Sequence, residues 1–591
     1  MNGYEALAFY LKAAGVNFCV LAQNEGLEPL ARALSEKGID FLVPISETAS
    51  AVIADGYARA SGKPAILIGR VEILKLITGT VSAWADKTPL LLISIEPAND
   101  MEEIDLAQVF KNVTRFQARA NAAEDVPEIL IKAFRAAVSL RGGPVFVEIP
   151  ESVLKEEVKT SKEQFNRIGQ RLKNAPMPVR TMCELDRIPR ALAMLSQAKR
   201  PLIFSGAGVI SSDACTEINH FARLMQIPII SSLGGMGSVF PDNPMHVGPP
   251  SYLAGEAFHT AIKETDVVLA VGCVFSGLDG FGIPPLWSGK IKFIQVNIDP
   301  EHIAFNPSAE LPIVGDARLI ISQMLEQARN YPIPLQRTKW LEKLKRLAQE
   351  HRQRVIDESS RPWKRIHPAS AALELTRLFM GEKDVRVVLD GGNTCLWAGM
   401  LTDIPGPRRG FFPTGMGTLG SGVPMAIGVK KAIGEARVVL ICGDGTFLYN
   451  IQEFETLRKH KIPLLVIVFN DSAWNMIRAG QVSSTGEVFG TDLPDTDYGR
   501  VAESFGCFGT KVRKKEEIEG AVKKALASGL PAVIDIEIDT DTIPDSLISF
   551  GRVEFEGAKM STKGTLRSIL TGKQKLDIRL WNQIKYIFRS F

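Results

Sequence analysis

Residues 438–471 read VVLICGDGTFLYNIQEFETLRKHKIPLLVIVFND, and this stretch decides the fold of the chain. The apolar runs 438–442 and 464–469 have the length and content of strands that are buried on both faces. Residues 451–460 can supply a crossover helix between them. The two strands are therefore predicted to be parallel neighbours in one sheet, with their carboxyl ends side by side.

Polar residues follow both predicted strands at that shared edge. Asp444 ends the first strand, and Asn470 and Asp471 come 26 and 27 residues later, at the end of the second. Open α/β sheets bind ligands at this edge, and such oxygen ligands suit Mg²⁺. The amides from Thr446 onward open a helix and favour an anion. The stretch predicts a site for Mg²⁺ and a diphosphate; the alternative is that Gly-Asp-Gly is only a turn.

This pattern of motifs resembles the fingerprint of the thiamine diphosphate (ThDP) enzymes. The resemblance implies that Asp444, Asp471 and the backbone carbonyl of Ala473 hold Mg²⁺. It also implies that the carbonyl of Gly417 accepts a hydrogen bond from the cofactor and that Leu419 lies under the bent cofactor. The expected cofactor-binding residues are Asn393, Thr394, Gly417, Leu419, Gly443, Asp444, Gly445, Thr446, Asn475 and Met476.

Glu47 is the candidate catalytic residue. It follows a predicted strand and begins a predicted helix, where an acidic side chain is also favourable for the helix dipole alone. The segment from Glu47 to Gly62 is similar to the glutamate-bearing segment of the pyrimidine-binding domain in ThDP enzymes. The resemblance implies that Glu47 hydrogen-bonds N1′ of the aminopyrimidine. It further implies a homo-oligomer with active sites at the subunit interface, Glu47 and Asp444 coming from different chains.

Length and composition place the chain among ordinary globular proteins. Of its 591 residues 45% are hydrophobic and 23% charged, and 69 basic against 66 acidic residues give a net charge of +3. Nothing in this balance indicates a nucleic-acid or membrane partner. The seven cysteines are scattered without a CxxC motif, which favours reduced thiols and a cytoplasmic location. No run is long enough to span a membrane, and the N-terminus has no signal-peptide pattern.

Alternating strand and helix patterns predict an α/β fold of three consecutive doubly wound parallel-sheet domains. The expected domains are a pyrimidine-binding domain at 1–170, a central FAD- or nucleotide-binding-like domain at 185–330, a diphosphate-binding domain at 365–545, and a basic extension at 546–591. The charged segment 156–190 is interpreted as a linker, and 339–359 as a solvated connector helix. From Arg552 onward the extension has nine basic against three acidic residues.

Several stretches depart from the family pattern. Gly69-Arg70-Val71-Glu72 stands where a Ser-Gly-Pro-Gly-type turn is usual. Met101 and Glu102 stand where acetolactate synthases carry Phe and Gln, so these two residues are the expected substrate contacts. In the central domain Gly206-Ala207-Gly208 is a weak dinucleotide signal or a tight turn. The arginine expected near a flavin is absent from Cys273–Gly277, which leaves FAD open as a cofactor.

The overall resemblance is strongest to the acetolactate synthase large subunit. It implies a ThDP- and Mg²⁺-dependent enzyme of branched-chain amino-acid biosynthesis, a homodimer or homotetramer, which decarboxylates pyruvate and adds the resulting enamine to a second 2-oxo acid. One alternative is a 2-hydroxyacyl-CoA lyase or an oxalyl-CoA decarboxylase-like enzyme with an acyl-CoA substrate, suggested by Met101-Glu102 and the basic extension. Another is a non-catalytic ThDP-binding paralogue, suggested by the altered turn at Gly69–Glu72.

Overall fold

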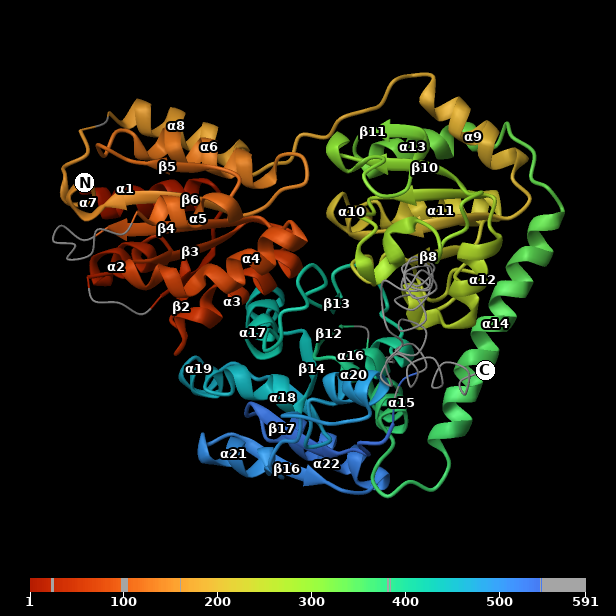
Figure 1. The fold of residues 1–591 in the computed structure, drawn as a ribbon. Coiled ribbons are helices and arrows are strands. Elements are labelled where there is room, and N and C mark those ends of the chain that lie inside the picture. Colours follow the sequence, from red (N-terminus) through yellow and green to blue (C-terminus); the bar gives the residue numbers. More distant parts are fainter. Residues whose placement is uncertain are drawn as a thin grey trace, which may run out of the picture.

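Three α/β domains follow one another along the chain in a computed structural model (Figure 1). It describes residues 1–22, 26–96, 105–159, 161–379, 382, 384–542 and 544. Each domain has one sheet, and every pair of neighbouring strands in these sheets runs parallel. Helices connect the strands, as parallel pairing requires. The predicted fold class is thus confirmed.

The N-terminal sheet has the strand order β2-β1-β3-β4-β6-β5. Its strands are β1 Phe18–Leu21, β2 Asp40–Leu42, β3 Ala65–Gly69, β4 Leu90–Glu96, β5 Gln117–Arg119 and β6 Val145–Pro150. Its helices are α1 Gly3–Ala13, α2 Glu28–Glu36, α3 Glu47–Ser61, α4 Ile77–Asp86, α5 Leu106–Phe110, α6 Val126–Val138, α7 Glu151–Lys155 and α8 Lys162–Asn174, with the 3₁₀ turns η1 Val71–Leu76 and η2 Lys111–Val113. Successive side chains of its strands enter opposite cores, as in β3 where Leu67 and Ile68 face different clusters.

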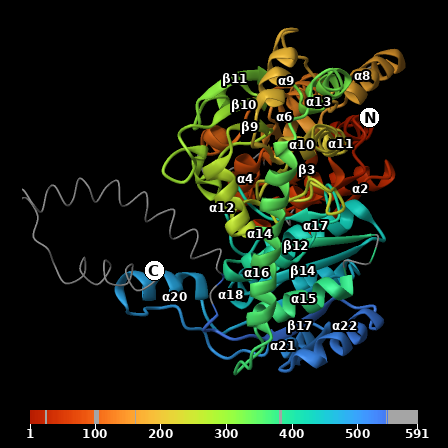
Figure 2. The same ribbon diagram turned by 90° about the vertical axis from the view of Figure 1, so that its right-hand side faces the viewer.

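The central sheet has the order β11-β10-β9-β7-β8. Its strands are β7 Pro201–Ser205, β8 Ile229–Ser231, β9 Val267–Val271, β10 Lys292–Asn297 and β11 Ala309–Val314. Its helices are α9 Arg187–Gln197, α10 Ala207–Ser211, α11 Cys215–Met225, α12 Glu256–Glu264 and α13 Ala317–Ala328, with η3 Ser251–Ala254, η4 Gly277–Gly282 and η5 Pro300–His302. Helix α14, Gln336–Ser359, then runs from this domain to the third, as Figure 2 shows.

The C-terminal sheet has the order β13-β12-β14-β15-β17-β16. Its strands are β12 Val385–Asp390, β13 Gly410–Phe411, β14 Arg437–Gly443, β15 Leu465–Asn470, β16 Phe508–Val512 and β17 Ala532–Glu537. Its helices are α15 Pro368–Phe379, α16 Asn393–Leu401, α17 Gly422–Ile433, α18 Asp444–Phe447, α19 Glu453–Lys459, α20 Asn475–Thr485, α21 Tyr498–Ser504 and α22 Ile518–Ala527, with η6 Leu448–Asn450 and η7 Lys515–Glu517. The predicted parallel pairing of 438–442 with 464–469 is confirmed.

The segment 156–190 is more than a linker. It contains α8, which starts with a capping box between Ser161 and Gln164 and packs on α1 and α6. Leu172 of this helix is fully buried. The sequence prediction missed the helix because its apolar residues are few and lie among many charges, so that tertiary contact rather than composition stabilises it.

The N- and C-terminal domains meet through α3 and α17, which Figure 1 shows lying between the two sheets. Two glycines allow a very close approach. A Cβ atom added at Gly56 would lie 2.3 Å from the carbonyl oxygen of Met425, and one added at Gly428 would lie 1.9 Å from that of Ile53. Apolar side chains of both domains form one continuous core around this contact.

Arg408 connects all three domains. Its guanidinium donates to the carbonyl of Arg59 in α3, at 3.3 Å, and to the carboxylate of Asp213 in the central domain, at 3.1 Å. Asp213 also pairs with Arg180, which in turn bonds Asp316 at the start of α13. The half-buried network fixes how the three sheets are oriented around the core.

We predict that Gly428→Ala lowers the midpoint of thermal unfolding, through a loss of about 1–3 kcal/mol of stability, because the added methyl group overpacks the α3–α17 contact. Gly520→Ala is the matched control. Gly520 lies in α22 with no atom within 4 Å of an added Cβ, and this change should be neutral or stabilising by about 0.5–1 kcal/mol. Equal midpoints for Gly428→Ala and wild type would contradict the close contact.

Candidate functional site

The carboxyl ends of β14 and β15 lie side by side at one edge of the C-terminal sheet. Their register pairs Gly443 with Phe469, so Asp444 and Asn470 leave the sheet at the same level. Asp444 begins α18, whose residues 444–447 are all buried. Asp444 and Asn470 thus come together at the edge where such sheets bind ligands.

Two buried carboxylates face this edge. Asp444 is 2% exposed and Asp471 6% exposed. Burial, and then the negative charge of Asp471, raise the pKa of Asp444 to about 8, while burial raises the pKa of Asp471 to about 6. Oδ1 of Asp444 accepts from the amide of Gly445 at 2.8 Å, but among the described residues its buried Oδ2 has no hydrogen-bond partner. Two buried carboxylates this close together are both charged only when a cation binds between them; otherwise one of them takes up a proton.

This donor set fits a hard divalent cation. Among the described residues, no three His, Cys, Asp or Glu side chains lie close enough together to hold a metal ion. A cation between Asp444 and Asp471 would therefore take its remaining ligands from backbone carbonyls, water or a phosphate, which is the usual way in which proteins hold Mg²⁺. Ala473, the predicted backbone ligand, lies in the same loop and bridges to Asp492.

Asn470 stabilises the loop that contains Asp471 and Ala473. Its amide nitrogen donates to the carbonyl of Thr496 at 3.1 Å and to Asp535 at 3.3 Å. Its Oδ1 accepts from the amide of Ser472, a residue with φ of +56°. Because both ends of the side chain are bonded within the protein, Asn470 shapes the loop that presents Asp471.

Asn393 brings an unsatisfied polar side chain to the same edge. It begins α16, directly after the end of β12, and is 9% exposed. Both its Oδ1 and its Nδ2 are buried, and no residue in the described part of the chain forms a hydrogen bond with them. Its neighbour Thr394 faces β14: a Cβ added at Gly443 would lie 3.2 Å from the Thr394 hydroxyl. Buried polar atoms normally have partners, so this pair indicates a bound polar group.

The loop before α17 is open to solvent. Gly417 is exposed and has φ of +61°, a conformation that favours glycine, and Leu419 is 39% exposed. Gly420 packs on Tyr449, since a Cβ added there would lie 2.3 Å from that of Tyr449. The predicted large apolar residue therefore stands on the surface beside α18 and η6.

Trp474 and Met476, at the start of α20, cover two glycines of this edge closely. The Trp474 ring would lie 2.7 Å from a Cβ on Gly445, and the Met476 side chain 2.7 Å from one on Gly392. Asn475 donates to the carbonyl of Thr540 at 2.8 Å. A side chain at either glycine would therefore clash with this segment.

Glu47 is the first residue of α3, at the carboxyl edge of the N-terminal sheet. The amide of Ser46 donates to Glu453 of α19 at 2.9 Å, which fixes the start of α3 against the C-terminal domain. The carboxylate of Glu47 accepts from Lys75 at 3.3 Å. In the part of the chain that the structure describes, no hydrogen bond or ion pair joins Glu47 to the predicted cofactor-binding residues.

Two further buried carboxylates are not among the predicted site residues. Asp390 ends β12, and its Oδ2 accepts from the amide of Gly422 at 2.8 Å, which anchors α17. Burial raises the pKa of Asp390 to about 7. Glu453 is fully buried and bonds Ser46 and Thr456. The signal for Asp390 was its place after an apolar run and before Gly-Gly; Glu453 had no such signal, because its partner is distant in sequence.

Met101 and Glu102, the predicted substrate residues, lie outside the described residues, as does the basic extension beyond residue 544. In the central domain, Gly206 and Gly208 pack on Gly272, with a Cβ on Gly206 only 2.2 Å from its carbonyl oxygen. Close packing of two loops thus accounts for this glycine pair. Nothing in the described residues supports FAD.

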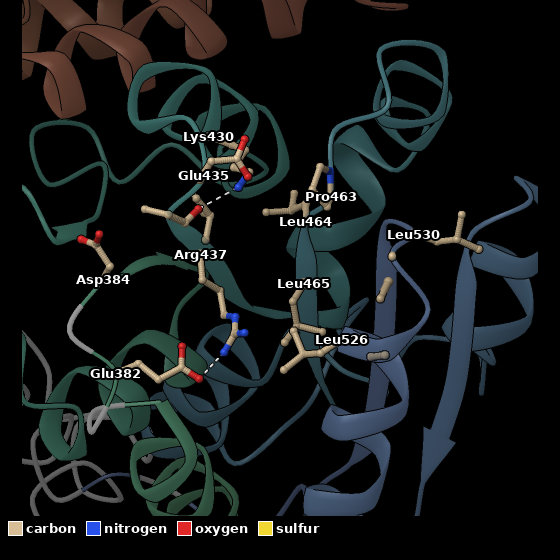
Figure 3. A pocket seen from close by; sticks show the side chains of 15 residues that line it. Glu382, Asp384, Lys430, Glu435, Arg437, Pro463, Leu464, Leu465, Leu526 and Leu530 are labelled. Carbon is tan, nitrogen blue, oxygen red and sulfur yellow. Dashed lines mark hydrogen bonds and ion pairs between the residues drawn. The ribbon is translucent and has the colours of Figure 1, made fainter.

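A separate pocket of about 440 Å³ opens at the opposite edge of the C-terminal sheet, where β14, β15 and β17 begin (Figure 3). Arg437 pairs there with Glu382, and Lys430 donates to the carbonyl of Ala436. None of the predicted site residues lines this pocket. The carboxyl edge, rather than this pocket, therefore remains the candidate site.

Two general expectations can be compared with the structure. All seven cysteines are free thiols, as expected. None of the helices in the described part of the chain is both long and apolar enough to cross a membrane.

Comparison with known protein families finds three matches in the order of the three domains. Residues 1–118 match the N-terminal TPP-binding domain of thiamine pyrophosphate enzymes, residues 188–324 their central domain, and residues 390–536 their C-terminal TPP-binding domain. Thiamine pyrophosphate is another name for ThDP. The third match includes Asn393, Asp444 and Asp471.

Whole-chain relatives agree with these matches. A probable acetolactate synthase large subunit from Methanocaldococcus jannaschii is 30% identical over 561 residues, 91% of this chain and 92% of the relative. One from Methanococcus aeolicus is 29% identical over 93% of both chains. The isozyme 3 large subunit from Escherichia coli K12 is 29% identical over 83% of this chain and 86% of its own. The chain therefore belongs to the thiamine pyrophosphate enzyme family, as an enzyme of the acetolactate synthase type.

Proposed function

We propose that the protein is a ThDP- and Mg²⁺-dependent carboligase that decarboxylates pyruvate and joins the remaining two-carbon unit to a second 2-oxo acid. The observation that carries this proposal is the buried pair Asp444 and Asp471 beside the unsatisfied side chain of Asn393. These groups fit a cation that bridges protein to a diphosphate. The reaction itself is inferred from the similarity to acetolactate synthases.

Each residue has a stated role in this proposal. Asp444, Asp471 and the carbonyl of Ala473 hold the cation. Asn393, Thr394 and the amides at Gly443, Gly445 and Thr446 bind the diphosphate. Gly417 and Leu419 set the shape of the bound cofactor, and Asn475 and Met476 complete its wall. Bound ThDP supplies the carbanion chemistry, while the protein holds and orients it.

Glu47 is proposed to exchange a proton with the aminopyrimidine ring of the cofactor at N1′. Its place at the start of a helix, with a backbone clamped by Glu453, gives the carboxylate a fixed direction. Positioned side chains of this kind contribute typically about 10²–10⁴-fold to proton-transfer steps.

A homo-oligomer with sites between subunits is proposed as well. Leu419 is 39% exposed, and Met416, Leu448 and Tyr449 around it are 42–57% exposed, an apolar surface at the mouth of the proposed site. Such patches are typical of protein interfaces. A second subunit that covers them would also exclude water from the cofactor. The cytoplasmic location stays a prediction from the reduced cysteines.

Purified protein with ThDP and Mg²⁺ should convert pyruvate to acetolactate. Glu47→Gln should lower kcat by about 10²–10⁴-fold while ThDP still binds. Glu256→Gln, a change at an exposed glutamate that also begins a helix, should leave kcat unchanged. Acetolactate can be followed by acid conversion to acetoin. Turnover of an acyl-CoA in place of pyruvate would redirect the assignment to the lyases.

Binding of Mg²⁺–ThDP should release protons through Asp444. Because the metal-free carboxyl has a pKa of about 8, it is protonated at pH 7, and a cation must displace that proton. Affinity should therefore rise by roughly tenfold from pH 6 to 7 and by less from pH 7 to 8, as the pH reaches this pKa. Calorimetry in two buffers measures the proton count. Asp444→Asn should remove this contribution to the pH dependence and weaken binding, whereas Asp242→Asn, at an exposed aspartate of the central domain, should do neither. Binding without proton release would contradict this role.

Mixing two inactive variants tests the location of the site. If Glu47 and Asp444 act from different subunits, co-refolded Glu47→Gln and Asp444→Asn chains should regain roughly a quarter of wild-type activity, because half of random dimers are hybrids with one intact site of two. If both residues act within one chain, the mixture stays inactive. Refolding of each variant alone is the control.

A further inference from the structure

The carboxylate of Glu47 forms an ion pair with Lys75, a residue that has no role in the proposed mechanism. Nζ of Lys75 lies 3.3 Å from Oε2 of Glu47. The glutamate side chain is 20% exposed and the lysine side chain 55% exposed. An ion pair this open contributes little to folding, about 0–1 kcal/mol. The ion pair matters because its carboxylate belongs to Glu47, the candidate catalytic residue.

Both partners leave fixed points of the backbone. Lys75 belongs to η1, which follows β3, and its neighbours Ile73 and Leu76 are fully buried in the core shared with the C-terminal domain. Glu47 follows Ser46, whose amide is held by Glu453. The two side chains therefore meet because two anchored segments leave the same edge of one sheet.

The segment that carries Lys75 follows the stretch Gly69-Arg70-Val71-Glu72, where the resemblance led us to expect a glycine-rich turn. The chain continues there as the 3₁₀ turn η1. That turn packs against α3, the helix that Glu47 begins. This packing brings Lys75 to the start of α3.

We propose that Lys75 is a positioning residue for Glu47. Its ammonium group holds Oε2, so Oε1 is the oxygen that would meet the aminopyrimidine nitrogen of a bound cofactor. A carboxylate on three rotatable bonds otherwise samples several orientations, and a fixed hydrogen-bond partner removes that freedom. The inference rests on the proposed role of Glu47 and adds a second residue to it.

The test compares Lys75→Met, which keeps the aliphatic stem, with Lys75→Arg, which keeps a cationic donor. The readouts are the dissociation constant of ThDP, the near-ultraviolet circular dichroism of the bound cofactor, and the rate of hydrogen–deuterium exchange at its C2 atom, followed by NMR after acid quench. Lys63→Met, at an exposed lysine of the same domain, is the control.

Lys75→Met should slow C2 exchange by about tenfold, the low end of losses that follow removal of a supporting partner. It should alter the dichroism of bound ThDP, with the KM for pyruvate within about twofold of wild type because the lysine supports only Glu47. Lys75→Arg should recover exchange to within about threefold, since arginine also donates to a carboxylate. Lys63→Met should match wild type in all three readouts.

Wild-type exchange and dichroism in Lys75→Met would show a surface ion pair only and would overturn the proposal. Loss of exchange in Lys75→Met without recovery in Lys75→Arg would equally exclude a role based on cationic pairing. Glu47→Gln separates this outcome from failure of the proposed function. If that variant exchanges C2 hydrogen at the wild-type rate, the role of Glu47 itself is wrong.

Discussion

The close contact between α3 and α17 is the constraint on which the rest of the structure depends. Gly56 and Gly428 let the backbones of two domains approach to a distance that any side chain would prevent. Around them the lower face of the N-terminal sheet and the upper face of the C-terminal sheet share one apolar core. Both α3 and α17 begin at segments that the proposed site uses, so this contact fixes where each chain presents Glu47 and the loop that contains Gly417 and Leu419, which in the proposed oligomer belong to two different sites.

Electrostatics at the carboxyl edge of the C-terminal sheet supports the proposal that a cation binds there. Asp390, Asp444 and Asp471 are all buried, and burial raises the pKa of each. An isolated protein holds such groups only at a cost in stability, as protonated acids or as charges without solvation. In the proposed complex this cost in stability is offset, because the cation balances the charge of the carboxylates and the diphosphate gives the amide of Asn393 a hydrogen-bond partner.

To the proposed site the N-terminal domain contributes a single carboxylate, whose orientation is fixed by its neighbours. Its carboxylate Glu47 has its backbone fixed from the C-terminal domain by Glu453, and its side chain contacts Lys75 from η1. A residue of the C-terminal domain thus fixes a group of the N-terminal domain, and the 3₁₀ turn η1 supplies the other partner.

The sequence by itself determined the three parallel sheets, because buried strands, crossover helices and glycine turns are local patterns with local causes. It also indicated Asp444 and Asp471 as candidates, since both follow predicted strands, whereas Glu47 and Asn393 became candidates through the resemblance to ThDP enzymes. Only the tertiary structure decided that α8 folds onto the first domain, that Glu453 clamps Ser46, and that Lys75 reaches Glu47. These contacts join residues 28 to 407 positions apart, and which side chains meet at such separations depends on how whole domains pack, which no local pattern encodes.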